Sequence, residues 1–165
     1  MSTAQFNDRV WAAAPLQLLI TNVSTMILPP MATELVDAGT DAWAAGTAYA
    51  YGDIVNSAGH FYWCVTPGGG NAGAAAPTHH DGDVTDGTLL WRYIHWSRNV
   101  VTLTNVEQAG HISIARGQAA VAQQGIVLYP YGTHNEGFGG PRPYSGAWYA
   151  ISDQLAGRRL AISEG

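Results

Sequence analysis

The sequence predicts an all-β protein: a discontinuous β-sandwich or jelly-roll-like domain with a small, aromatic-rich β-module inserted into it. Three observations lead to this expectation. Short apolar or alternating runs recur along the chain, with turn residues between them. The periodicity of a long amphipathic helix is missing, because Gly or Pro interrupts most windows. The composition also changes in the middle of the chain, where residues 42–93 concentrate aromatic residues, glycines and acids.

The flanking parts supply the expected strands of the outer domain, which are residues 16–20, 100–104, 111–115, 126–129, 147–151 and 159–162. Alternation within 111–115 places Ile112 and Ile114 on one face. The best helical candidate is the short stretch 118–124, which lies between two glycines. The Gly/Pro-rich stretch 137–143 cannot form regular structure, and two interpretations stay open: a surface loop, or an arm that touches a neighbouring subunit.

The change in composition predicts three segments: residues 1–38 as the first part of the outer domain, residues 39–97 as the insertion, and residues 98–165 as the second part. Residues 37–40 read as a linker. Within the insertion we expect strands at 47–55 and 59–66 around a turn at 56–59, a Gly/Ala-rich loop at 67–77, and a closing strand at 89–95.

The charge content narrows the possible partners. Charged residues make up only 12% of the 165 residues, lysine is absent, and the formal net charge is −5. We therefore expect no nucleic-acid partner. We also expect no membrane span, because the apolar stretch 10–20 is short and interrupted by Pro15 and Gln17. Surfaces covered by other protein, as in a dense assembly, would explain the few charges; drift in a GC-rich genome would explain them equally well.

The spacing of the inserted module resembles that of a known family. The framework comprises Trp43, Tyr49, Gly52-Asp53, Val55, Gly59, Tyr62, Cys64, Pro77, Asp86-Gly87-Thr88 and Trp91. This pattern resembles the small chitin- and cellulose-binding modules of the family 5/12 type, and the same pattern recurs in structural proteins of tailed bacteriophages. The C-terminal runs 125–130, 148–151 and 160–164 are similar to those of small virion proteins of the head-decoration or fibre-base kind.

The resemblance implies that sugar binding would need exposed aromatic faces. Strand spacing makes Tyr49, Tyr62, Cys64 and Trp91 core residues, and alternation points their neighbours the other way. The carbohydrate-binding candidates are therefore Trp43, Tyr51, Phe61 and Trp63. The favoured alternative is that these rings pack against the outer domain or a neighbouring subunit.

We expect no catalytic residue, no metal and no cofactor. Cys64 lies in an apolar run and reads as a buried thiol rather than a nucleophile. No nucleophile elbow, P-loop, dinucleotide fingerprint or zinc motif is present. The run 79–86 contains histidines and aspartates, but its spacing fails the EF-hand pattern and adjacent histidines point apart in an extended chain. A solvated polar loop is the favoured interpretation.

Together these features predict a phage virion structural protein that decorates or cements the capsid through multivalent contacts. The major capsid protein or other virion proteins would be its partners, on the capsid surface rather than the tail. A homo-oligomer is expected, with a trimer favoured. The alternative is a polysaccharide-binding adhesion module on a phage head or tail, and an enzyme acting on glycans is a distant third.

Overall fold

The structure is a computed structural model that describes residues 16–36, 38–137, 140 and 142–164. Across these residues strands account for 42% and helix for 3%, so the predicted all-β class is confirmed. The described helix, α1 (Ala32–Leu35), is a single turn. No helix in this part of the chain has the length and apolar character needed to cross a membrane.

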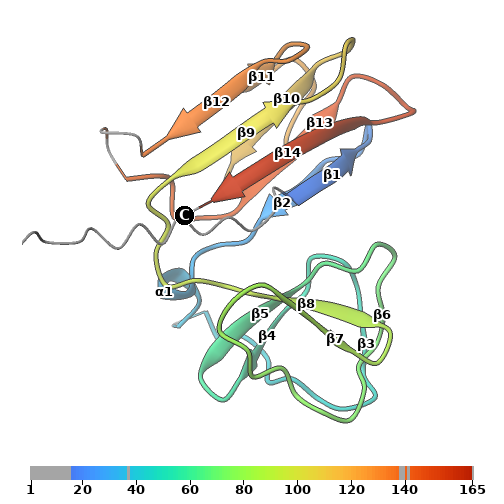
Figure 1. Cartoon of the computed structure of the whole chain (residues 1–165), viewed down its shortest axis with the longest axis vertical. Helices are drawn as coiled ribbons and strands as arrows, with labels where there is room; N and C mark the ends of the chain where they lie inside the picture. The colour runs from blue at the N-terminus through green and yellow to red at the C-terminus, as the bar shows by residue number, and fades with distance from the viewer. Residues whose placement is uncertain (1–15, 37, 138–139, 141, 165) are drawn as a thin grey trace, which may run out of the picture.

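Two four-stranded antiparallel sheets form a sandwich (Figure 1). The first sheet has the order β1 (Leu16–Ile20), β14 (Arg158–Glu164), β9 (Val101–Asn105) and β12 (Thr133–Glu136). The second has the order β11 (Ile126–Leu128), β10 (Ile112–Arg116), β13 (Trp148–Ser152) and β2 (Thr25–Leu28). Each sheet therefore combines strands from both ends of the described chain.

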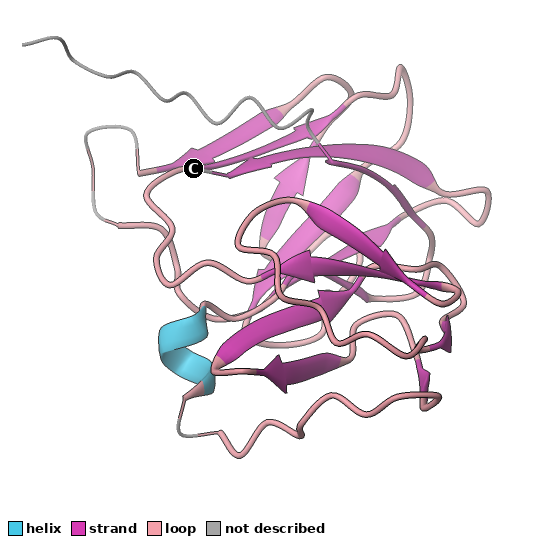
Figure 2. Cartoon of the chain, turned by 60° about the horizontal axis from the view of Figure 1, so that its bottom comes forward, coloured by secondary structure: helices cyan, strands magenta, loops and turns pink. Residues whose placement is uncertain are grey.

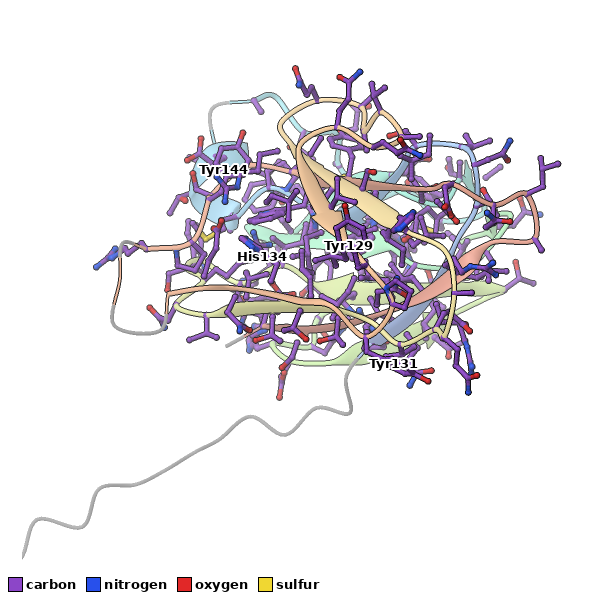
Figure 3. The ribbon with its side chains drawn as sticks, turned by 90° about the horizontal axis from the view of Figure 1, so that it is seen from above. Tyr129, Tyr131, His134 and Tyr144 are labelled. Carbon is purple, nitrogen blue, oxygen red and sulfur yellow. The ribbon has the colours of Figure 1, made fainter. Side chains whose placement is uncertain are left out.

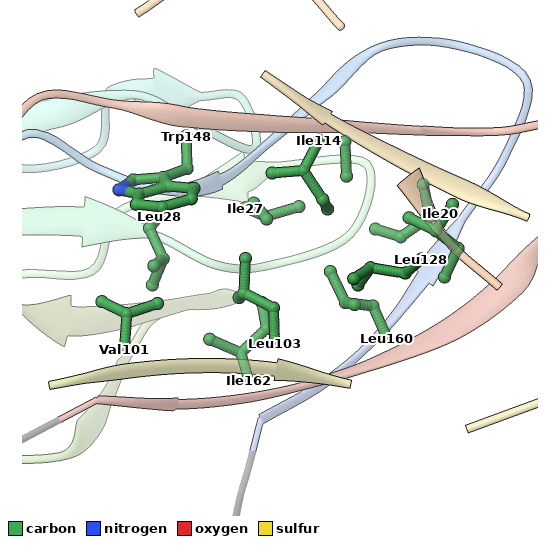
Figure 4. Close-up of a cluster of buried hydrophobic side chains, with 12 residues drawn as sticks. Ile20, Ile27, Leu28, Val101, Leu103, Ile114, Leu128, Trp148, Leu160 and Ile162 are labelled. Atoms are coloured by element: carbon green, nitrogen blue, oxygen red, sulfur yellow. The ribbon is translucent and has the colours of Figure 1, made fainter. Parts of the chain in front are cut away.

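The main core lies between these two sheets (Figure 4). Alternate residues of β9 and β13 are buried, as expected for strands with one face toward a core. Ile112 and Ile114 are both fully buried, which confirms the face predicted from their alternation. Trp148 is also fully buried in this cluster, and its indole packs among aliphatic side chains of both sheets.

The residues between β2 and β9 form a separate, smaller set of sheets. One four-stranded antiparallel sheet has the order β4 (Ile54–Ser57), β5 (His60–Cys64), β8 (Leu89–Tyr93) and β7 (Asp83–Asp86). A two-stranded ribbon pairs β3 (Ala48–Tyr49) with β6 (Gly70–Asn71). The expected turn at 56–59 joins β4 to β5, with positive φ at Ala58 (52°) and Gly59 (83°). These sheets are called the module below.

The module lies beneath the β1/β2 side of the sandwich (Figure 1), and Figure 2 shows α1 beside the module sheet. The amide of Ala32 donates to the carbonyl of His95 at 3.1 Å, so the chain enters and leaves the module at adjacent points. Arg98 is 5% exposed and holds this junction. Its guanidinium donates to the Glu164 carboxylate at 2.7 Å and to the Pro29 carbonyl at 3.0 Å.

Three expectations about local structure are wrong. The stretch 118–124 forms turns instead of a helix; Gln123 has φ of 61°, which a right-handed helix does not allow. The strand expected at 47–55 is two strands, because Gly52 (φ 96°) bends the chain and the Asp53 carboxylate accepts from the Ala50 amide at 2.8 Å. Strands β2, β6, β7 and β12 are present where none was predicted, and β6 lies within the expected loop 67–77.

Candidate functional site

Phe61 and Trp63 lie on the face of β5 that the sequence assigned to sugar binding, but that face is covered. Their exposed fractions are 4% and 0%, and they pack with Ala32 and Leu35 of α1. A ring without an accessible face cannot stack on a sugar, so the outward placement expected for these two residues is corrected. Of the favoured alternatives, packing against the outer domain describes their position, because Ala32 and Leu35 belong to the predicted segment 1–38.

Tyr51 and Trp43 are half-buried, and each indole or phenol group already has a protein partner. The Tyr51 hydroxyl donates to the carbonyl of Met26 on β2 at 3.1 Å, and its ring meets Trp63 edge-on at 5.8 Å. Burial raises the pKa of Tyr51 to about 12. Trp43 Nε1 donates to the Asp86 carboxylate at 3.1 Å. Tyr51, Phe61 and Trp63 share one buried cluster and Trp43 lies in another, so the four candidate rings form no common exposed platform.

The residues expected in the module core are in it. Tyr62, Cys64 and Trp91 have no exposed surface, and Tyr49 meets the Trp91 ring edge-on at 5.1 Å. Burial raises the pKa of the Cys64 thiol, which favours the unreactive protonated form. The alternation predicted for β5 is thus confirmed, although both faces of the strand are buried.

The polar run 79–86 is only partly a solvated loop. Its second half is strand β7, where Asp83 receives a two-pronged ion pair from Arg92 at 2.6 and 2.7 Å. His79 and His80 do point apart: His79 lies against Tyr62, and His80 reaches His60. Among the described residues, no group of three or more His, Cys, Asp or Glu side chains is placed to hold a metal ion.

Two exposed tyrosines, Tyr129 and Tyr131, lie at the opposite side of the sandwich from the module. Strands β11 and β12 are the terminal strands of their sheets there. Figure 3 looks onto this side and labels the residues that we call the open-edge surface: Tyr129, Tyr131, His134 and Tyr144. Tyr129 and Tyr131 are 64% and 63% exposed, and Tyr144 is 37% exposed. Sequence reasoning missed this surface, because its side chains come from loops and an edge strand without a periodic pattern.

A rigid turn presents the first two tyrosines. Residues 129–132 form a β-turn closed by the Gly132 amide donating to the Tyr129 carbonyl at 2.7 Å. Tyr131 sits at the third position with φ of 59°, where glycine is usual. Asn105, which is fully buried, anchors the turn: its amide donates to the Gly132 carbonyl, and its Nδ2 donates to the Leu128 carbonyl.

Tyr129 is also supported from the side. Its ring meets His111 edge-on at 4.7 Å, and His111 Nδ1 lies 3.0 Å from the Asp153 carboxylate. Burial alone would raise the pKa of Asp153, but the hydrogen bonds from the backbone and ring of His111 lower it. The ionised carboxylate therefore holds the imidazole in place beneath the tyrosine.

A polar network supports the other end of the surface. Glu136 accepts from Arg116, from the Tyr144 amide at 3.0 Å, and lies 3.2 Å from His134 Nε2. Arg116 belongs to β10 and Glu136 to β12, so this ion pair ties the two sheets together. Burial lowers the pKa of His134, and the nearby Arg116 charge lowers it further; the Glu136 charge is already balanced by Arg116.

A cleft of about 440 Å³ separates the module from the sandwich. Its charged lining is paired internally: Arg92 with Asp83, and Arg98 with Glu164. The first pair joins β7 to β8 within the module and the second pair holds the junction, so neither pair is free to bind a ligand.

The chain matches no protein-family model, and no curated protein sequence is similar to it. Its function is therefore inferred from its residues and their geometry.

Proposed function

We propose that this chain is a structural protein of a tailed-phage virion that decorates or cements the capsid by docking its open-edge surface onto neighbouring virion proteins. The observation that carries the proposal is the group of exposed aromatic side chains at the β11/β12 edge. Each of them is held by buried or paired residues beneath it.

The chemistry of this surface suits a protein partner. Tyrosine and arginine are enriched where interfaces gain most of their energy. Tyrosine buries a large area at low conformational-entropy cost, and arginine supplies a planar group with five N–H donors. Arg116 is partly exposed beside Tyr144 and His134, with its guanidinium 5.1 Å from the Trp148 ring centre. The terminal strands β11 and β12 add backbone groups that another strand can pair with.

The position of the module supports a display role. The module lies under the β1/β2 side of the sandwich, and the turn between β11 and β12 that carries Tyr129 and Tyr131 lies on the opposite side, whereas the backbone of Tyr144 meets Arg98 near the junction. A chain that docks through β11 and β12 would carry the module away from the shell. The phage setting itself rests on the resemblance of residues 42–93 and of the C-terminal runs to phage structural proteins.

The polysaccharide-binding alternative has weaker support. Phe61 and Trp63 are buried, and the Trp43 indole nitrogen is engaged by Asp86. A glycan array with the whole chain separates the two proposals. Binding that is lost when Trp43 is replaced by Ala would favour the adhesion function, whereas virion assembly that depends on the open-edge surface would favour decoration.

The direct test is the double variant Tyr129→Ala, Tyr131→Ala. We expect it to fold as the wild type does but to lose incorporation into virions, measured by occupancy in a cryo-electron microscopy reconstruction. Native mass spectrometry should show the homo-oligomer, with a trimer expected, losing stability in the same variant. Trp96→Ala is the matched control, since Trp96 is 46% exposed but lies near the module. Full occupancy of the double variant would refute the proposed docking surface.

A further inference from the structure

Four of the six histidines gather around two tyrosines of the module. Two of them meet directly. His60 begins β5, and His80 comes from the loop before β7; their Nε2 atoms are 3.2 Å apart. Both rings lie against Tyr93, with centroid distances of 5.8 and 5.9 Å.

We propose that His60 and His80 form a chelating pair for a zinc ion, bound through the two Nε2 atoms. Zinc binds imidazole nitrogen at about 2.0–2.1 Å in tetrahedral geometry, which places two such nitrogens roughly 3.3 Å apart. The observed separation of 3.2 Å matches this spacing. The pair is therefore already close to the arrangement that the ion requires.

The relative orientation of the rings supports a shared ligand. Their centroids are only 4.4 Å apart and their planes meet at 55°, so the rings do not lie end to end as in a linear hydrogen bond. Without metal, one Nε2–H donates to the other Nε2. On binding, that ring proton moves to Nδ1, and both Nε2 lone pairs become available to the ion.

The surroundings set the expected strength of binding. His80 is exposed, so an ion can reach the pair and keep water as its remaining ligands. Nδ1 of His60 is buried and has no hydrogen-bond partner among the described residues. Ligating histidines usually donate this second N–H to a neighbour, and loss of such a partner weakens metal affinity about 10–100-fold. The site is thus weaker than a structural zinc centre, and its occupation would fasten the loop that carries His80 onto β5.

Calorimetric titration of the whole chain with Zn²⁺ tests the proposal. We expect one ion per chain, with an affinity that falls by about tenfold or more in His60→Ala and in His80→Ala, since each removes a ligand. His95→Ala is the matched control: it also contacts Tyr93, but its ring is outside the pair, so binding should persist. Circular dichroism verifies that each variant is folded.

A second measurement needs no variant. The ¹⁵N resonances of the ring nitrogens should show that Zn²⁺ shifts Nε2 of both His60 and His80. Zinc that fails to shift both, or affinity that survives either single substitution, would overturn the assignment. Equal loss in His95→Ala would do the same, because it would indicate a diffuse histidine cluster rather than a chelating pair.

Discussion

Trp63 belongs to β5, packs with residues of α1 and has no exposed surface, and the Arg92 guanidinium carbon is 6.0 Å from the centre of its ring. Its local sequence is that of an outward-facing strand residue, but its environment is that of a core. At the open edge the reverse holds: Tyr131 is exposed and adopts a backbone conformation that tyrosine seldom takes. The role of an aromatic side chain in this protein therefore depends on what covers it.

Trp63→Ala should lower the free energy of unfolding by about 3–5 kcal/mol, because it empties a large volume in a packed core. Urea denaturation monitored by circular dichroism measures this change. Trp96→Ala, at a position 46% exposed, should change stability by less than about 0.5 kcal/mol. A mild effect at Trp63 would mean that its ring is accessible after all.

Tyr131→Gly should raise the free energy of unfolding by up to about 1 kcal/mol while weakening assembly. Glycine relieves the cost of positive φ but loses the aromatic contact. Tyr131→Ala is the matched control, since it also removes the ring but keeps a Cβ at positive φ, and should bring no gain in stability. Equal stability of the two variants would contradict the strain argument.

His134 should make the protein less stable in acid. Its pKa is lowered in the folded state, so below the ordinary histidine pKa of about 6.5 the unfolded chain takes up the proton first. The contribution of neutral His134 to stability is therefore fully present above that pH. It is lost as the pH falls toward the lower pKa that His134 has in the folded state. Denaturation midpoints measured from pH 8 to pH 5 should show this slope, and His134→Gln should reduce it. An unchanged slope in the variant would exclude His134 as its source.

At the scale of elements, the turn between β7 and β8 fastens the module together. Asp86 is 7% exposed and accepts from Trp43 Nε1 and from the Gly73 amide at 2.8 Å. Gly87 has φ of 63°, and a Cβ there would lie 2.5 Å from the Asn71 carbonyl oxygen. The Thr88 hydroxyl accepts from the Asn71 amide at 2.9 Å. Asp86 and Thr88 of the Asp-Gly-Thr motif thus accept hydrogen bonds that hold the turn, and Gly87 allows the close approach of the backbone.

Asp86→Ala should lower the free energy of unfolding by about 1–3 kcal/mol, because it leaves two part-buried N–H groups without their carboxylate acceptor. Thermal and urea unfolding would measure the loss. Asp81→Ala serves as the control: Asp81 is exposed, and its carboxylate lies no closer than 4.0 Å to the His95 ring, so little change is expected. Similar losses in both variants would show that removal of a negative charge, rather than loss of these two hydrogen bonds, lowers the stability.

At the scale of the whole molecule, the two chain segments that enter and leave the module are hydrogen-bonded to each other through Ala32 and His95. A domain inserted into another needs its ends close together in this way. The sandwich core, in contrast, uses strands from 16–28 and 101–164. We therefore propose that the sandwich folds without the module.

Replacing residues 33–95 with a short Gly/Ser linker should leave a folded β protein, because Arg98 keeps its contacts with Pro29, Tyr144 and Glu164. Far-ultraviolet circular dichroism and limited proteolysis measure the outcome. A variant that removes the same segment and carries Arg98→Ala should be markedly less stable. An unfolded product of the first replacement would refute the insertion proposal.

The sequence by itself determined the all-β class, most strands of the sandwich, the turn at 56–59 and the inner face of β5. These features follow from local patterns: alternation in 111–115 specifies that Ile112 and Ile114 share the apolar face of β10, which packs into the core, although Ser113 on the other face is also buried. Short strands such as β2 and β12 lack such a pattern. Their backbones pair with the neighbouring strands β13 and β9, which lie far from them in the sequence.

Only the tertiary structure decided which surfaces are free. The second face of β5 is covered by α1, which lies more than twenty residues earlier in the chain. The open-edge surface contains Tyr129 and Tyr144, and the proposed chelating pair contains His60 and His80. In both cases the residues are far apart in the sequence, and no local pattern predicts the direction of the turns that bring them together. Side-chain type and spacing specify what a residue can do. Whether the residue is buried, and which distant residues it contacts, depends on long-range packing. The sequence therefore identified the module core and not the candidate sites.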